Sequence, residues 1–544
     1  ITGLVIICSI MFLWMWYASP SKEEIEKKRL LKDSLELVEK QNAKDTINKS
    51  QQRAETGNDF IEKKQLATDN SQTSDSLKTA ELINKYDVFA SSATDSNKFF
   101  VIENEKIKIT ISGKGGHICS VQLKQYYTHD SLPLILFDKD SSSFGLLFDT
   151  ENNRTINTTE LCFEPIVNSF SVSKNGVKKI AMRLYAKSDS DTGKTTNNKL
   201  RYIEYEYSLS ENDYMVYCKL NIVGMENIIA KNLNEIGLQW AMKTPSHEKD
   251  LKNQKNASTV YYKYLEEDPD YISETSDETK TLDAKIKWVA FKQQFFTSVI
   301  IADNFFEKSG ANITSYNEKS SKKYVKMLAT NLTLPYNHQA QETFAMKYYF
   351  GPNHFQTLKK YDLLLEKQIP LGWGIFGWVN KFLVIPVFNF LDSFNLNYSI
   401  IIICLTLIFK TLLFPVAYKT YTSSAKMRIL KPEIEEINKK FAKEDAMKKQ
   451  QATMALYKKA GVNPLAGCIP ALLQMPILFA LFRFFPASIE LRQHGFWWTT
   501  DLSTFDSVWD FGYVPVIDFI YGDHVSVWAL LCTITTLIYT HMNS

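Results

Sequence analysis

A lysine lies near the middle of an apolar run that is long enough to cross a membrane. Residues 398–418 read YSIIIICLTLIFKTLLFPVAY, and Lys410 is the only charged residue among them. About 20 apolar helical residues span the hydrocarbon core of a bilayer, and a charge at its centre costs roughly 3 kcal/mol on insertion scales. A sequence retains such a charge where it faces protein or water, so we expect a polar site at Lys410. The alternative is that the side chain reaches the interface, since Tyr418 and Lys419 follow about 12 Å further along the helix.

Three other apolar segments predict membrane helices. Residues 1–17 end in aromatic residues and lack a small-residue cleavage site, which indicates a transmembrane signal anchor. Residues 464–485 predict a span with Gln474 as its central polar group. A glutamine at such a position either hydrogen-bonds a neighbouring helix or contacts a substrate. Residues 525–544 predict a further span with threonines along one side.

The charge distribution predicts how these segments are oriented. Residues 419–462 carry 11 basic and 5 acidic residues, a net charge of +6, and basic segments stay on the cytoplasmic side. If 1–17 crosses outward and 398–418 crosses back, residues 371–394 lie on the outer surface as an interfacial amphipathic helix. The polar, aromatic segment 486–524 is then an outer loop.

The composition changes twice between the first two predicted spans. Residues 21–85 hold 13 basic and 13 acidic residues, so the segment 18–85 predicts a flexible charged tether that cannot form a core. From residue 86 to 365 apolar and polar residues alternate, as in 107–111, and turn signals separate the runs. This pattern indicates one large antiparallel β-sandwich or barrel.

Residues 419–462 predict a cytoplasmic helical hairpin that breaks near 440–444. Met427, Leu430, Ile434 and Ile437 form one apolar stripe of it. Its basic surface is either an ordinary solvated face or a contact surface for anionic lipid headgroups or ribosomal RNA. The candidate contact residues are Lys426, Arg428, Lys431, Lys439 and Lys440.

Motifs for covalent chemistry are missing from the sequence. It contains no nucleotide-binding Walker loop, no H-E-x-x-H or C-x-x-C metal motif and no G-x-S-x-G elbow. We therefore predict no catalytic residues, no metal and no cofactor, and the net charge of +3 predicts no binding to DNA. Cys119, Cys162 and Cys218 have no short paired spacing; one disulfide among them is allowed, and none is predicted.

Several stretches resemble the bacterial YidC membrane protein insertases. The most specific is NPLAGCIPALLQMPILFALF at 463–482. The others are ELRQ at 490–493, DLS at 501–503, SSAKMRILKP at 423–432, GGHICSVQLK at 115–124, WVAFKQQFF at 288–296 and YFGP at 349–352. Together they cover nearly the whole chain apart from the tether.

The resemblance implies an α-helical polytopic membrane core and a large all-β periplasmic domain, a β-supersandwich, in a Gram-negative inner membrane. It implies a polar groove between five spans, two of which would follow residues 525–544. The groove residue that is usually arginine corresponds to Lys410, which keeps the charge without the bidentate fork. Gln474, Thr406 and Thr411 complete the predicted groove.

Further expectations follow from the same resemblance. The chain would insert nascent membrane proteins without covalent chemistry, and its partners would be those proteins, the ribosome, the Sec translocon and membrane lipids. Two other functions remain open from the residues alone. One is a membrane-anchored carbohydrate-binding protein in which Trp240 and Trp288 stack on a sugar. The other is a transporter with Lys410 in its path, although no inverted repeat is visible.

Overall fold

The computed structural model describes residues 80–93, 97–166, 177–186, 201–318, 321, 323–440, 446–461, 469–512, 522 and 524–543. The predicted signal anchor, nearly all of the predicted tether and the start of the 464–485 segment lie outside these residues.

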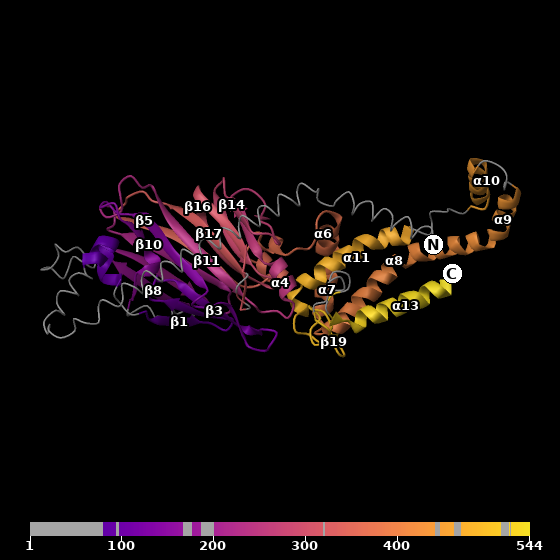
Figure 1. Ribbon diagram of the computed structural model, residues 1–544, viewed down its shortest axis with the longest axis horizontal. Helices are drawn as coiled ribbons and strands as arrows, with labels where there is room; N and C mark the ends of the chain where they lie inside the picture. The colour runs from indigo at the N-terminus through magenta and orange to yellow at the C-terminus, as the bar shows by residue number, and fades with distance from the viewer. Residues whose placement is uncertain are drawn as a thin grey trace, which may run out of the picture. The chain divides into compact units, whose positions relative to one another are not determined.

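Residues 99–352 form the predicted all-β domain, in which the strand pairs are antiparallel (Figure 1). A four-stranded sheet has the order β1-β2-β3-β4. A 14-stranded sheet contains the central order β6-β5-β11-β17-β16-β18-β10-β9-β8-β7. The strands are β1 (Phe99–Glu103), β2 (Ile107–Ser112), β3 (Ile118–Tyr127), β4 (Pro133–Phe137), β5 (Ser142–Asp149), β6 (Thr155–Asn157), β7 (Glu164–Pro165), β8 (Lys178–Tyr185), β9 (Tyr202–Leu209), β10 (Met215–Val223), β11 (Glu235–Pro245), β12 (Thr259–Tyr264), β13 (Asp270–Tyr271), β14 (Glu278–Thr281), β15 (Ile286–Lys292), β16 (Phe296–Asn317), β17 (Tyr324–Pro335) and β18 (Gln341–Pro352).

The alternation read from the sequence sets which side chains enter the core. Ile107, Ile109 and Ile111 on β2 are fully buried, while the residues between them are partly exposed. In a strand, successive side chains point to opposite faces, so this period of two buries one face of the sheet. Cys119, Cys162 and Cys218 are buried thiols that form no disulfide with one another in the described part of the chain.

Trp240 and Trp288 belong to this core, which excludes the alternative in which they stack on a sugar. The Trp240 ring stacks on Phe291 with centroids 4.1 Å apart. Trp288 is fully buried, and its indole N–H donates to the backbone oxygen of Leu363 at 2.9 Å. Neither ring has a free face for a ligand, because packing in the interior covers both.

Two buried histidines make the stability of the β-domain dependent on pH. The His117 ring packs on Phe144, and Nε2 of His247 lies 2.8 Å from the backbone oxygen of Ile135. Burial lowers the pKa of each histidine from 6.5 to about 4. Each must therefore stay neutral in the folded protein, whereas the unfolded chain takes up a proton below pH 6.5.

We expect the free energy of unfolding to fall as pH decreases from about 6.5 to about 4, by up to roughly 3 kcal/mol for each histidine. Stability is full above the unfolded pKa and changes no further from this source below the folded one. Denaturant titrations of the protein and of His117→Gln across this range measure the effect, and the variant should lose about half of the slope. Identical slopes for the two proteins would contradict the assignment.

Three short helical elements precede or interrupt the strands of the β-domain: η2 (Asp87–Ala93), η3 (Thr158–Glu160) and α4 (Leu251–Ala257). The helical part follows the β-domain and begins with α5 (Phe355–Lys359), η7 (Leu365–Gln368), α6 (Ile375–Val379), the π-helical turn η8 (Asn380–Val384) and α7 (Ile385–Asp392). The longer helices are α8 (Tyr398–Ile429), α9 (Lys431–Lys440), α10 (Ala446–Lys459), α11 (Ile469–Ala487) and α13 (Val527–Asn543). Between α11 and α13 lie η10 (Ile489–Leu491) and the short strands β19 (Trp509–Asp510) and β20 (His524–Val525).

Helices α7, α8 and α11 pack around a core of their own. Ile401, Leu405 and Phe409 recur every four residues on α8 and are buried against Phe388 and Phe484. Residues four apart share one helix face, so this spacing holds one side of α8 against its neighbours. Figure 1 labels α8, α11 and α13 among the helices that follow the β-domain.

Two described helical stretches are long and apolar enough to cross a membrane by length and composition: 375–392 and 398–429. The interfacial placement of 371–394 therefore stays a prediction, since this segment also meets the criteria of a span. The helix that carries Lys410 continues past residue 418 to Ile429. Of the predicted hairpin stripe, Met427 thus lies on α8, whereas Ile434 and Ile437 lie on α9.

Candidate functional site

Lys410 and Gln474, the two polar residues predicted from their apolar surroundings, are in contact in the structure. Nζ of Lys410 on α8 donates to Oε1 of Gln474 on α11 across 3.4 Å. The two residues are 64 positions apart in the chain. The Lys410 side chain is exposed on the protein surface, and the Gln474 side chain is half-buried. A cationic donor and an amide thus lie together where apolar stretches of two helices meet.

The two predicted groove threonines bond to their own helix. Thr406 Oγ1 donates to the backbone oxygen of Ile402, and Thr411 Oγ1 to that of Leu407, each at 2.8 Å. Thr406 is one turn before Lys410 and shares its face, whereas Thr411 is the next residue and points elsewhere. In the described residues, neither hydroxyl contacts Lys410 or Gln474.

Two polar contacts that sequence reasoning missed also join helices of this region. The hydroxyls of Tyr421 on α8 and Tyr539 on α13 lie 3.0 Å apart. The buried Asn380 amide donates to the backbone oxygens of Leu371 and Ala480 at 2.6 and 2.8 Å. Asn380 begins the π-helical turn η8, and such turns often mark functional positions. It links the segment before α7 to α11.

The predicted basic contact residues are all exposed. Lys426 and Arg428 occupy the last turn of α8, and Lys439 and Lys440 the last turn of α9. Lys431 begins α9 and is exposed as well. Cations in a last helical turn stabilise the helix through its dipole. This stabilising role by itself explains the cations at Lys426, Arg428, Lys439 and Lys440.

A buried ion pair holds the loop after α11 against the β-domain. Nε of Arg492 lies 3.0 and 2.9 Å from the two carboxylate oxygens of Glu248, and the two side chains are 2% and 9% exposed. The Arg492 guanidinium also donates to the backbone oxygen of Tyr127 at 2.6 Å. The next residue, Gln493, donates to the backbone oxygens of Tyr127 and Thr128. Arg492 and Gln493 belong to the motif ELRQ at 490–493.

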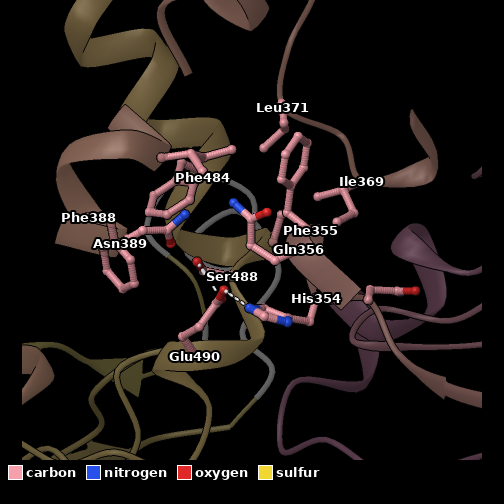
Figure 2. Close-up of a pocket in the computed structure, with 13 residues that line it drawn as sticks. His354, Phe355, Gln356, Ile369, Leu371, Phe388, Asn389, Phe484, Ser488 and Glu490 are labelled. Carbon is pink, nitrogen blue, oxygen red and sulfur yellow. Dashed lines mark hydrogen bonds and ion pairs between the residues drawn. The ribbon is translucent and has the colours of Figure 1, made fainter. Parts of the chain in front are cut away.

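Figure 2 shows a second contact of this junction, around a small cavity of about 20 Å³. Nε2 of His354, which precedes α5, lies 3.4 Å from a carboxylate oxygen of Glu490. Ser488 donates to the same carboxylate at 3.0 Å. A cavity of this size holds about one water molecule, so His354, Ser488 and Glu490 pack closely around it.

Together these features define a β-domain that is held by an ion pair to a set of apolar helices, two of whose stretches are long and apolar enough to cross a membrane, with a polar contact between α8 and α11. No cluster of three or more histidine, cysteine, aspartate or glutamate residues in the described ranges is arranged to hold a metal ion.

Comparison with known proteins identifies the class further. Residues 390–544 match the family described as 60Kd inner membrane protein, and residues 100–386 match the family described as YidC periplasmic domain. The membrane protein insertase YidC of Parabacteroides distasonis is 36% identical over 551 residues, which cover 99% of this chain and 82% of that protein. The same-named protein of Azobacteroides pseudotrichonymphae is 38% identical over 473 residues, 84% of this chain and 73% of that protein.

The chain belongs to the YidC family of membrane protein insertases. This confirms the fold class expected from the sequence, with a β-rich periplasmic domain followed by a helical region. Among solved structures, a galactose mutarotase-like protein from Lactobacillus casei has a TM-score of 0.31 and 9% identity, covering 46% of this chain and 100% of that one. A score this low supports no conclusion.

Proposed function

We propose that the chain inserts membrane proteins through a polar groove at the α8–α11 contact. The observation that carries this proposal is the 3.4 Å contact between Lys410 and Gln474 inside apolar helices. An unpaired polar group costs several kcal/mol when it enters hydrocarbon. A fixed charge and an amide at this depth lower that cost for the polar flank of a substrate, and the exposed apolar side chains of α8 and α11 then release its apolar segment into lipid. The scheme has no covalent step and needs no cofactor.

The proposed orientation makes the chain a multi-pass inner-membrane protein. Helices α9 and α10 lie in the cytoplasm, where their basic side chains meet the ribosome, and the β-domain lies in the periplasm. The match of residues 100–386 to a periplasmic family supports an outer position for the start of 371–394. The Sec translocon is the proposed partner for substrates that this groove does not insert alone.

Site-specific crosslinking tests the groove directly. A photoreactive amino acid at Thr406 shares the face of Lys410, whereas one at Leu412, two residues beyond Lys410, points about 200° away from it. Both positions are exposed, so they form a matched pair. With a ribosome-bound membrane protein as substrate, we expect crosslinks to the nascent chain from position 406 and few from position 412. A third reporter at Lys440 should reach ribosomal components.

Equal crosslinking from positions 406 and 412 would show that the substrate meets α8 through lipid, without a defined groove. Crosslinks from position 440 to periplasmic proteins would overturn the orientation.

A further inference from the structure

A polar cavity of about 340 Å³ lies where the C-terminal end of α11 meets the β-domain. It is distinct from the Lys410 contact and from the cavity in Figure 2. Its lining includes two cations, one carboxylate, three amides and one aromatic ring: Lys292, Arg483, Glu274, Asn253, Asn256, Gln294 and Phe482. Polar groups of both signs in one cavity point to a ligand that itself carries both charges.

The ammonium of Lys292 is buried with few partners. The side chain is 1% exposed, and Nζ donates to the backbone oxygen of Ala257 at 2.7 Å. The nearest carboxylate oxygen, on Glu274, is 3.9 Å away. An ammonium has three donors, and a buried charge is costly unless it is paired and hydrogen-bonded. Nζ also lies 5.7 Å from the centroid of the Tyr261 ring. The described residues thus give this ammonium one hydrogen bond, and its side chain lines the cavity.

A second, independent group in the lining also lacks partners. Gln294 is 7% exposed, and its Oε1 has no hydrogen-bond partner among the described residues. Most buried polar atoms in folded proteins are hydrogen-bonded. One cavity thus contains a buried amide and a buried ammonium that both have too few hydrogen-bond partners. This combination indicates that a bound ligand supplies the missing partners.

The α11 side of the cavity carries the residue types that are typical of a membrane edge. Phe482 is 73% exposed on a helix whose other apolar side chains, such as Leu478 and Phe479, are also exposed. Arg483 is the next residue, and it is exposed with no hydrogen bond or ion pair to a described residue. A cation at the end of an apolar helix sits where lipid headgroups lie. The cavity thus opens between an acyl-chain surface and a set of headgroup-sized polar partners.

We propose that this cavity binds the phosphoethanolamine headgroup of a membrane phospholipid in the outer leaflet. Lys292 and Arg483 donate to the phosphodiester oxygens, as ammonium and guanidinium groups do to phosphates. The Glu274 carboxylate, whose side chain is 35% exposed, and Gln294 accept from the headgroup ammonium. The acyl chains extend along Phe482 and the exposed face of α11. The bound lipid would tie the β-domain to the bilayer beside α11, independently of the Lys410 groove.

Lipid binding to the purified full-length protein in detergent tests the proposal. Didecanoyl phosphatidylethanolamine is titrated, and retained lipid is counted by native mass spectrometry. We expect one saturable site, with Arg483→Gln weakening binding at least about tenfold because a charge-assisted contact is lost. Lys292→Met should have a similar effect. Lys381→Gln is the matched control, because Lys381 is an exposed cation on η8 that does not line the cavity.

Two further probes separate the possible sources of the headgroup chemistry. Soluble phosphoethanolamine without acyl chains should bind at least about tenfold more weakly than the lipid, since it buries no apolar surface on Phe482. Didecanoyl phosphatidylglycerol lacks the ammonium and should also bind more weakly. Equal binding of all three probes, unsaturable binding, or an equal loss with Lys381→Gln would overturn the proposal.

Discussion

Lys410→Ala in the full-length protein is expected to reduce insertion of substrates with acidic leading flanks about tenfold or more, and to affect neutral flanks less. A charge pair at an effective dielectric constant near 20 is worth up to about 4 kcal/mol at close contact. Water in the groove lowers this value, but even about 1.4 kcal/mol changes an equilibrium tenfold. Lys410→Arg keeps the charge at the same depth and should retain activity. Insertion of paired substrates that differ only in flank charge measures the effect.

The same substitution should stabilise the protein. Lys410 is exposed from the protein within an apolar helix, and its one described side-chain partner is Gln474 at 3.4 Å. Removing it relieves an insertion cost of roughly 3 kcal/mol, which exceeds the contribution of about 1 kcal/mol from a typical hydrogen bond. Thermal melting in detergent should therefore show a higher midpoint together with poorer insertion. A lower midpoint with normal insertion of both substrates would make Lys410 a structural residue.

The all-β domain could be predicted because burial of one face imposes a period of two. Ile107, Ile109 and Ile111 show this period in the sequence and are buried in β2. The strand order could not be predicted in this way. Strand β11 lies between β5 and β17, which are far apart in the sequence, and such pairing depends on the packing of the whole domain rather than on any local pattern.

The sequence left the environment of Trp240 and Trp288 open for the same physical reason. An aromatic residue on a strand has the same local sequence whether it faces a ligand or the core. What decides between these is the residue opposite, here Phe291, which stacks on Trp240 from a strand more than forty positions later in the chain.

The candidate site was partly predictable because a polar residue stands out only against an apolar background. Lys410 and Gln474 lie in the middle of such runs, and they are the two that meet. Asn380 lies beside Lys381 in a shorter run, so its local sequence does not mark it as important. Its amide nevertheless joins the segment at Leu371 to α11 at Ala480. Arg492 lies in a polar loop, where charge is ordinary. Its only signal in the sequence is the motif ELRQ. This motif indicates resemblance to the YidC family, but it does not indicate that the Arg492 side chain is buried.

Loss of one partner of the Arg492–Glu248 pair should be the most destabilising single change at the junction. Both side chains are nearly buried, and the carboxylate oxygens lie 3.0 and 2.9 Å from Nε of Arg492. Arg492→Leu leaves a buried carboxylate without its counter-ion and the Tyr127 carbonyl without a donor. Breaking one partner of such a pair typically costs about 3–5 kcal/mol. Glu248→Gln leaves a buried guanidinium uncompensated and should have an effect of similar size.

The double variant Glu248→Leu/Arg492→Leu separates charge burial from simple loss of contact. Replacement of a whole buried ion pair by apolar residues is often neutral or stabilising, so the double variant should be more stable than either single variant. Denaturant unfolding and limited proteolysis of the loop at 488–512 provide the two measurements, since a released loop becomes accessible to protease. Single variants that unfold like the parent and keep the loop protected would show that Arg492 does not hold it. If instead only the double variant regains protection, the ion pair matters through its charge balance, and apolar packing suffices to keep α11 attached to the β-domain.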